Sequence, residues 1–402
     1  MPGGAGGYAG GRNPLRPARY IEPGAVVGVL GGGQLGAMFA AAGRRLGYRI
    51  AAWDPDPDAP ALKVVDHPLR AAFTDPDALE GFASTISAAT YEWENIPVAL
   101  TEALDRLVPV LPAPRILGLL QNRIDEKTFL AREGFPVVPF KAVPTPDELT
   151  VPEEIGFPCL CKTATAGYDG KGQWRLAEPS EARALGERLR QTDQKGPWIL
   201  ERFLSFAKEL SVVVVRAADG DRRAFPAAEN LHEVGILRAS RVPAEVEPGI
   251  AEQAASLAMA IVKALDGVGV FCVELFLMPD RRLFVNEVAP RPHNSGHYTL
   301  DACTVSQFEQ QVRAVCGLPL GEVRLLCPAV MINLIGEDLR RIGSGEGLRT
   351  LLRLPGAKLH VYGKRTIRAG RKMGHVTFLR EKIEDAWQTA VAFRDHLRAS
   401  TS

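Results

Sequence analysis

Residues 270–297 read VFCVELFLMPDRRLFVNEVAPRPHNSGH, and this stretch decides how the central part of the chain folds. Two apolar runs flank a polar turn, which predicts an antiparallel hairpin. A two-residue turn at Asp280-Arg281 places Glu274 directly opposite Glu287. Like charges in that position destabilise a sheet, so the pair needs a counter-charge unless both side chains are solvated at a sheet edge.

The expected counter-charge is Mg²⁺, with Mn²⁺ as a possible substitute, because Mg²⁺ binds one or two carboxylates together with nucleotide phosphates. Asn286 can add a carbonyl oxygen to the two glutamates. An exposed hairpin with two solvated glutamates is the alternative. The next loop carries Arg291 and His293, donors suited to an anion, and so favours a substrate site beside the metal.

A second pattern is the glycine-rich segment KTATAGYDGKGQ at residues 162–173. Predicted strands flank it on both sides, so it cannot be the type of phosphate loop that opens a helix. A glycine-rich hairpin can fold over a triphosphate and donate main-chain N–H groups, with Lys162 and Lys171 as point charges. An ordinary tight turn is the alternative interpretation.

Near the start of the chain, Gly31, Gly33 and Gly36 follow an apolar strand and open a helix. This order predicts a βαβ unit and a parallel sheet. The spacing, with Asp54 after the next strand, also fits a dinucleotide fingerprint, so a nicotinamide-dependent dehydrogenase is one alternative. A weaker interpretation is a turn that brings some anionic ligand close to main-chain N–H groups.

A short basic segment lies near the C-terminus, where five cations fall between Lys364 and Lys372 without an acidic residue. It is either a solvated turn or a phosphate site for the substrate. The whole chain has a net charge of +1, which gives no general attraction to nucleic acid or an anionic membrane. No apolar run approaches the roughly 20 residues of a membrane helix.

The six cysteines include no C-x-x-C pair and sit mostly in apolar runs, so we expect reduced thiols in a cytoplasmic protein. The alternation of elements predicts mixed α/β and α+β architecture. We expect a flexible tail at 1–24, a Rossmann-like parallel-sheet domain at 25–115, a central domain at 116–325 and a small α+β domain at 326–402.

Together these motifs resemble the 5-(carboxyamino)imidazole ribonucleotide synthase family of ATP-grasp ligases. The resemblance extends from Val26 to His375, and its implied fold is an ATP-grasp domain between an N-terminal Rossmann-like domain and a small C-terminal domain. The segments that carry it are GGGQLG (31–36), YEWENIP (91–97), K…GYDGKGQ (162–173), NLH…GILR (230–238), NEVAPRPHNSGH (286–297) and GRKMGH (370–375). Ala37, Ala164, Ala166 and Ala369 depart from the usual family pattern.

The resemblance implies a reaction in which ATP, bicarbonate and aminoimidazole ribonucleotide give carboxyaminoimidazole ribonucleotide, ADP and phosphate. It also implies a homodimer with small-molecule substrates and no nucleic-acid or membrane partner. Another ATP-grasp carboxylate–amine ligase is the first alternative, ahead of the dehydrogenase and of a non-catalytic nucleotide sensor.

The resemblance further implies roles for individual residues. ATP would be bound by Arg123, Lys162, Gly167, Tyr168, Asp169, Gly170, Lys171, Gly172, Gln173, Glu201, Arg202, Phe203, Leu204, Glu209, His232, Asn286 and Glu287. The metal would be bound by Glu274, Asn286 and Glu287, and the ribonucleotide by Gln34, Glu92, Tyr168, Lys364, Arg371 and Lys372. The catalytic residues would be Arg291, His293 and Asp169, and either His293 or Asp169 could accept the amine proton.

Overall fold

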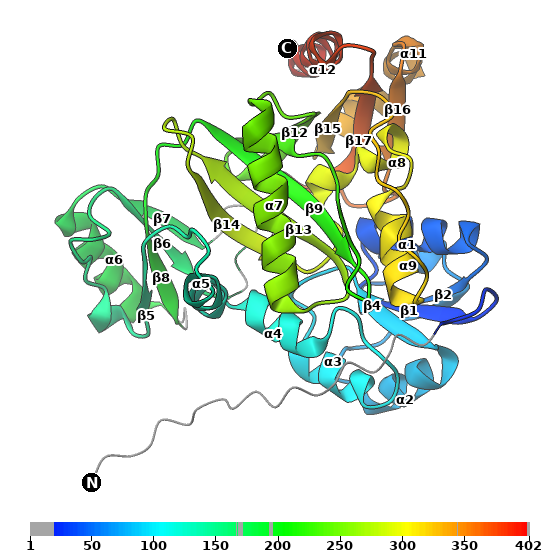
Figure 1. Ribbon diagram of the computed structural model, residues 1–402, viewed down its shortest axis with the longest axis horizontal. Coiled ribbons are helices and arrows are strands. Elements are labelled where there is room, and N and C mark those ends of the chain that lie inside the picture. The colour runs from blue at the N-terminus through cyan, green and yellow to red at the C-terminus, as the bar shows by residue number, and fades with distance from the viewer. Residues whose placement is uncertain (1–19, 166, 168–171, 193–195, 344, 400–402) are drawn as a thin grey trace.

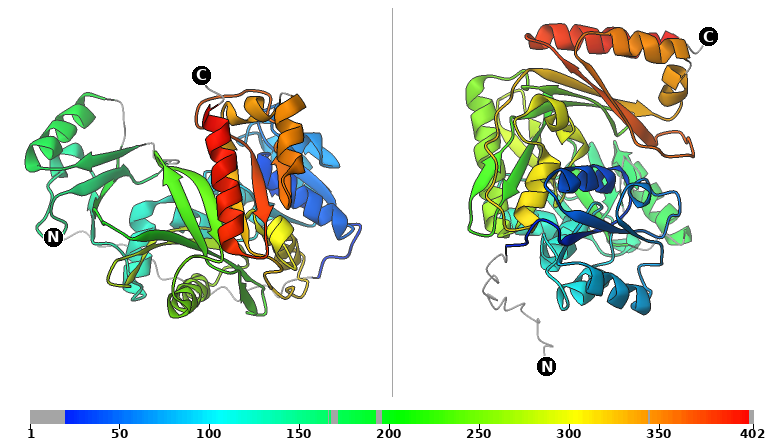
Figure 2. Two further views of the ribbon diagram at one scale, coloured as in Figure 1. Left: turned by 90° about the horizontal axis from the view of Figure 1, so that it is seen from above. Right: turned by 90° about the vertical axis from the view of Figure 1, so that its right-hand side faces the viewer.

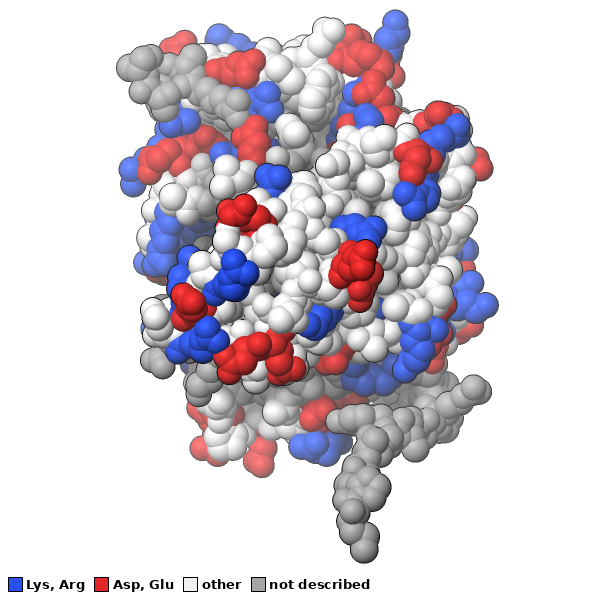
Figure 3. Space-filling view, turned by 90° about the vertical axis from the view of Figure 1, so that its left-hand side faces the viewer, with Lys and Arg blue, Asp and Glu red and all other residues white. Residues whose placement is uncertain are grey.

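The computed structural model describes residues 20–399 except 166, 168–171, 193–195 and 344, and contains three sheets (Figure 1). Within these ranges, no helix is both long enough and apolar enough to cross a membrane. All six cysteines are free thiols, and five of them are buried. On the face shown in Figure 3, basic and acidic side chains lie side by side and neither sign gathers into one patch.

The N-terminal sheet is parallel, with strand order β3-β2-β1-β4, as expected. Every residue of β1 is buried, because helices pack against both faces. The elements are β1 (Val26–Leu30), α1 (Gln34–Arg45), β2 (Arg49–Trp53), β3 (His67–Leu69), α2 (Pro76–Thr85), β4 (Ala88–Tyr91) and α3 (Val98–Asp105).

The predicted tail at 1–24 extends too far into the chain. Residues 1–19 lie outside the described part, but Ile21 is buried against the N-terminal domain. Its main-chain N–H donates to Cys316 O at 3.0 Å, and its carbonyl accepts from the Tyr48 hydroxyl at 2.7 Å. The chain is therefore attached to the core five residues before β1 begins.

The second sheet is antiparallel, with order β5-β8-β6-β7, and α6 covers it to form a lobe at one side of the molecule (Figure 2). Two helices precede it. Asn122 separates them, and its side chain accepts from Ile124 N at 3.0 Å as the cap of the second helix. The elements are α4 (Pro114–Gln121), α5 (Arg123–Arg132), β5 (Phe140–Val143), β6 (Cys159–Thr163), β7 (Gln173–Leu176), α6 (Pro179–Gln191) and β8 (Trp198–Arg202).

The largest sheet has the order β14-β13-β9-β11-β12-β15-β17-β16, with β10 paired to β9. Helix α7 lies across one face of β9 and β13, and α9 packs against the other (Figure 1). Because both faces are covered, β9 contains the continuous apolar run Val212–Val215. The elements are β9 (Lys208–Arg216), β10 (Arg222–Ala224), β11 (Ala228–Glu233), β12 (Ile236–Val242), α7 (Pro248–Leu265), β13 (Gly269–Leu277), β14 (Leu283–Ala289), α8 (Thr299–Ala302) and α9 (Gln307–Val315).

The C-terminal strands continue this sheet, because β15 pairs antiparallel with β12 along Ala239–Val242. Helix α12 covers the C-terminal strands (Figure 2). Residues on β17 are thus connected to β13 and β14 through one hydrogen-bonded sheet. The remaining elements are β15 (Ala329–Ile335), α10 (Asp338–Gly343), α11 (Gly345–Arg353), β16 (Ala357–Val361), β17 (Lys372–Leu379) and α12 (Ile383–Ala399).

Candidate active site

The hairpin β13–β14 places Glu274 directly opposite Glu287, as predicted, but the predicted turn is wrong. Met278 N donates to Arg282 O at 2.9 Å, so the turn has three residues, with Arg281 in the left-handed region at φ +72°. If this register continued unchanged along the hairpin, Asn286 rather than Glu287 would lie opposite Glu274.

A β-bulge restores the pairing of the two glutamates. Between Glu274 and Leu275 the register shifts by one residue, and Asn286 is the extra residue in β14. Two residues of a bulged strand oppose a single partner, which turns Asn286 towards Glu274. Its Nδ2 lies 3.2 Å from Glu274 Oε2. The three side chains predicted to bind a metal therefore lie together.

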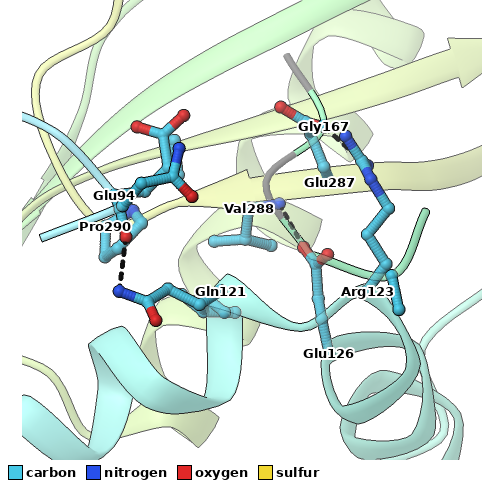
Figure 4. A pocket seen from close by; sticks show the side chains of 12 residues that line it. Glu94, Gln121, Arg123, Glu126, Gly167, Glu287, Val288 and Pro290 are labelled. Carbon is cyan, nitrogen blue, oxygen red and sulfur yellow. Dashed lines mark hydrogen bonds and ion pairs between the residues drawn. The ribbon is translucent and has the colours of Figure 1, made fainter. Parts of the chain in front are cut away.

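The two glutamates differ in charge environment. Burial disfavours the charge on Glu287, but the Arg123 guanidinium, 2.9 Å away, outweighs it and lowers the pKa of Glu287 (Figure 4). Burial and the charge of Glu287 raise the pKa of Glu274 to about 7. Arg123, predicted to bind ATP, is thus paired with one predicted metal ligand.

A buried cation cluster lies next to this hairpin. Lys162 Nζ is 2.5 Å from Glu201 Oε2, and Lys127 Nζ is 3.6 Å from Glu201 Oε1. Burial disfavours the charge on Glu201, but the positive charges of the two lysines outweigh this effect and lower the pKa of Glu201 to about 2. Burial also lowers the pKa of Lys162. Sequence reasoning identified Lys162 and Glu201 but missed Lys127, although it follows Arg123 by one helical turn on α5.

A second missed residue is Glu126, also on α5. Its carboxylate accepts from Val288 N at 2.5 Å (Figure 4), and burial together with the charge of Glu287 raises its pKa to about 8. Glu126 lines a cavity of about 50 Å³ together with Arg123, Glu287 and Gly167. This small cavity lies between α5, the hairpin and the start of the glycine-rich loop.

The other predicted ATP residues do not line this small cavity or lie outside the described part of the chain. Tyr168, Asp169, Gly170 and Lys171 lie outside the described residues. Glu209 on β9 pairs with His232 on β11, and this contact outweighs burial and raises the pKa of His232. Gly172 has a φ of +70°, and the exposed residue Gln173 pairs with Lys162 in the β6–β7 ladder. The Arg202 side chain donates to the carbonyls of residues 154 and 155. The Arg175 guanidinium lies over the ring of Phe203, and Leu204 is half-buried.

Two carboxylates of the protein itself accept hydrogen bonds from the main-chain N–H groups of the glycine turn before α1. Glu92 accepts from Gly33 N at 2.6 Å and from Gly36 N at 2.9 Å, and Asp54 accepts from Gly32 N at 2.6 Å. The N–H groups that would bind a dinucleotide pyrophosphate are therefore occupied. This overturns the dehydrogenase alternative and shows that the expected anion is a side-chain carboxylate.

A larger cavity, of about 190 Å³, lies beside this turn. It brings together three of the predicted substrate residues and both described catalytic candidates. Its lining residues are Gln34, Leu35, Glu92, Trp93, Arg291, His293, Asn294 and Lys372. Lys364 donates to Lys372 O at 2.9 Å, whereas Arg371 donates to Thr366 O at 2.8 Å and does not line this cavity.

Arg291 links the two cavities, and His293 lies beside the glutamate hairpin. Arg291 forms an ion pair with Glu94, which lines the small cavity, while Arg291 itself lines the large one. His293 Nε2 lies 3.4 Å from Glu274 Oε1. Burial and the charges of Arg291 and Lys372 lower the pKa of His293 well below its usual value. Glu94 was missed, although it follows Glu92 by two residues in the loop after β4.

Comparison with protein families matches three successive segments. Residues 25–121 match the ribonucleotide synthetase preATP-grasp domain, and residues 128–308 match the ATP-grasp domain. Residues 329–389 match the phosphoribosylaminoimidazole carboxylase C-terminal domain.

Whole-chain relatives agree with these matches. The chain is 44% identical to the N5-carboxyaminoimidazole ribonucleotide synthase of Bacillus subtilis, over 92% of this chain and 95% of that protein. It is 41% identical to the Brucella melitensis enzyme of the same name, over 90% of this chain and 98% of that protein.

Solved structures give the same result. An ADP complex of an N5-carboxyaminoimidazole ribonucleotide synthetase matches with a TM-score of 0.88 and 40% identity, covering 94% of this chain and 99% of that one. The Aspergillus clavatus synthase in complex with ADP and 5-aminoimidazole ribonucleotide matches with a TM-score of 0.82 and 30% identity, with the same coverage. With three domain matches in order and relatives aligned over nearly their full length, the chain belongs to the N5-carboxyaminoimidazole ribonucleotide synthase family of ATP-grasp ligases.

Proposed function

We propose that this chain uses ATP and bicarbonate to carboxylate 5-aminoimidazole ribonucleotide, giving N5-carboxyaminoimidazole ribonucleotide, ADP and phosphate in purine biosynthesis. The observation that carries the proposal is the Glu94–Arg291 ion pair, which has one residue in each cavity. A reaction that activates one substrate with ATP and then transfers it to another needs two adjoining sites. Two of the chain's relatives are named N5-carboxyaminoimidazole ribonucleotide synthase, after the product of this reaction.

We place Mg²⁺, or Mn²⁺ in its stead, at Glu274, Asn286 and Glu287. The donor set fits a hard divalent cation, because two carboxylates and an amide lie together. Burial and the charge of Glu287 raise the pKa values of Glu274 and Glu126, and a bound cation would favour the charged forms of both carboxylates. Among the described residues, no three His, Cys, Asp or Glu side chains are arranged to hold a metal, so phosphate oxygens would complete the coordination.

When bound, the metal would neutralise the phosphate oxygens of ATP. Lys162 lies beside this position and would add a point charge to the transferring phosphoryl group. Arg123 is paired with Glu287, and metal binding to Glu287 would leave the Arg123 guanidinium available for phosphate. We assign the glycine-rich loop 167–173 to the same ATP site.

Bicarbonate is a poor electrophile, and phosphorylation converts it to carboxyphosphate, from which phosphate can leave. Arg291 and His293 would bind this anion where the two cavities adjoin. The ribonucleotide would occupy the larger cavity, with its amine towards Arg291 and its phosphate towards Lys372. We further propose that the enzyme is cytoplasmic and acts as a homodimer.

Substrate dependence tests the proposed function directly. Release of ADP should require ATP, bicarbonate and aminoimidazole ribonucleotide together, because phosphoryl transfer is useful only when the acceptor amine is bound. The assay should include a panel of other small amines. Equal ADP release with any of those amines would point to a different carboxylate–amine ligase, and release without an acceptor would contradict the assignment.

The metal assignment predicts different effects for the two glutamates. Glu274→Gln and Glu287→Gln should each lower kcat by about a hundredfold or more and shift the Mg²⁺ dependence to higher concentration. In the ligand-free protein, Glu274→Gln should hold or raise the melting temperature because it removes a like charge. Glu287→Gln should be the less stable of the two, since it leaves Arg123 without its partner.

Glu229→Gln is the matched control for these variants. Glu229 lies in the same sheet and pairs with Lys208 at 2.9 Å, away from both cavities. Its substitution should leave the Mg²⁺ dependence unchanged. Wild-type turnover by both hairpin variants at limiting Mg²⁺ would contradict the metal site.

The substrate site predicts a dependence on the ribonucleotide phosphate. Lys372→Ala should weaken ribonucleotide binding about tenfold or more in calorimetry, because a charge-assisted hydrogen bond is lost. The dephosphorylated nucleoside should bind wild type and variant equally weakly, and ATP affinity should change little. Arg371→Ala should have a smaller effect, since Arg371 does not line the cavity. Equal nucleotide and nucleoside affinities for wild type would remove the phosphate site.

A further inference from the structure

A chain of buried hydrogen bonds runs from His293 into the large sheet. His293 Nδ1 lies 2.8 Å from Ser295 Oγ, and Ser295 Oγ lies 2.7 Å from Ser211 Oγ on β9. Asn230 on β11 donates from Nδ2 to Ser211 Oγ at 2.9 Å, and Ser240 on β12 donates to Asn230 Oδ1 at 2.8 Å. All members behind His293 are buried, and the two serines next to the histidine are at most 2% exposed. None of these four residues was among the predicted site residues.

A main-chain donor fixes the direction of this chain at the histidine. The Ser295 main-chain N–H points at His293 Nδ1, at 3.3 Å, and a main-chain N–H can only donate. Nδ1 is therefore an acceptor, so the Ser295 hydroxyl, which can donate or accept, donates its proton to Nδ1. Ser295 Oγ then accepts from the Ser211 hydroxyl, and Ser211 Oγ accepts from the Asn230 amide. Two donors converge on Nδ1, which leaves no room for a proton on that atom.

We propose that the hydroxyl chain formed by Ser295, Ser211 and Asn230 fixes His293 as the neutral tautomer that carries its proton on Nε2. These three are positioning residues, because they act through His293. The inference deepens the proposed function and rests on it, since His293 lines the cavity assigned to the ribonucleotide and bicarbonate. It goes beyond that assignment by stating which nitrogen carries the proton.

The fixed tautomer determines what His293 offers to a ligand. Nε2 is the nitrogen on the side of Glu274, 3.4 Å from its Oε1. With a proton on Nε2, the ring donates a hydrogen bond to an oxygen of bicarbonate or carboxyphosphate. The same proton prevents Nε2 from accepting a proton from the attacking amine or from binding a metal. Of the two candidate bases, this excludes His293.

The tautomer can be measured in the wild-type protein without any substitution of the chain. Protein labelled with ¹⁵N at histidine gives long-range ¹H–¹⁵N correlations whose pattern differs among the two neutral tautomers and imidazolium, and His293→Asn identifies the signals of His293. We expect the Nε2–H pattern in the ligand-free protein at pH 7. An Nδ1–H or imidazolium pattern would overturn the proposal, whatever reaction the protein catalyses.

A second experiment tests whether the hydroxyl chain is responsible. Ser295→Ala leaves only the longer main-chain bond to Nδ1, so we expect some Nδ1–H tautomer and a kcat about three- to tenfold lower, with the KM for ATP within about twofold of wild type. Ser211→Ala should have the same effects to a smaller extent, because Ser295 can still donate. An unchanged tautomer and wild-type kcat in Ser295→Ala would overturn the proposal.

Thr377→Val is the matched control. Thr377 is a fully buried residue of the same sheet whose hydroxyl has no hydrogen-bond partner among the described residues, so this variant removes a buried hydroxyl outside the chain. Its tautomer pattern and kcat should equal those of wild type. A loss of kcat in Thr377→Val equal to that in Ser295→Ala would assign the effect to general packing and contradict a positioning role. Absence of ribonucleotide-dependent ADP release in wild type would instead reject the proposed function, while the tautomer result would stand.

Discussion

The site depends on two carboxylates that the hairpin holds face to face inside the protein. Glu274 and Glu287 repel each other, and burial increases the energetic cost of their charges. Arg123 neutralises Glu287, while Glu274 is contacted by the amide of Asn286 and by His293. This imbalance explains why the arrangement suits a cation and phosphate groups, which would supply opposite charges in the same small volume. Selection for folding stability alone would not retain two buried carboxylates that face each other.

The two cavities keep their relative position because a few strong contacts cross between the domains. The Glu94–Arg291 ion pair joins the loop after β4 to the loop after β14, and Glu92 caps the helix that supplies Gln34. On the opposite side, β12 pairs with β15, so Lys372 on β17 belongs to the same sheet as the hairpin. The site is therefore built from all three parts of the chain, and none of them forms it alone.

The sequence predicted the parallel N-terminal sheet and the hairpin because these depend on local apolar runs and turn residues. It predicted the Glu274–Glu287 pair from a wrong turn, and a bulge at Asn286 compensated for the error. A bulge has no local sequence signal comparable to a glycine turn. Lys127 and Ser211 were missed because their roles arise from contacts with residues 74 and 84 positions away. The large sheet was also not foreseen as continuous, since pairing between β12 and β15 is a long-range contact.

The central claim is that the carboxylate hairpin and its neighbouring cations direct phosphoryl transfer from ATP to bicarbonate. Transfer of isotope from ¹⁸O-labelled bicarbonate tests this claim most directly, because a bicarbonate oxygen attacks the phosphorus atom and stays with phosphate when carboxyphosphate breaks down. The account predicts one ¹⁸O atom in each phosphate released during ribonucleotide-dependent turnover, measured by mass spectrometry before the label exchanges with water. Phosphate that carries only oxygen from ATP and water would contradict it.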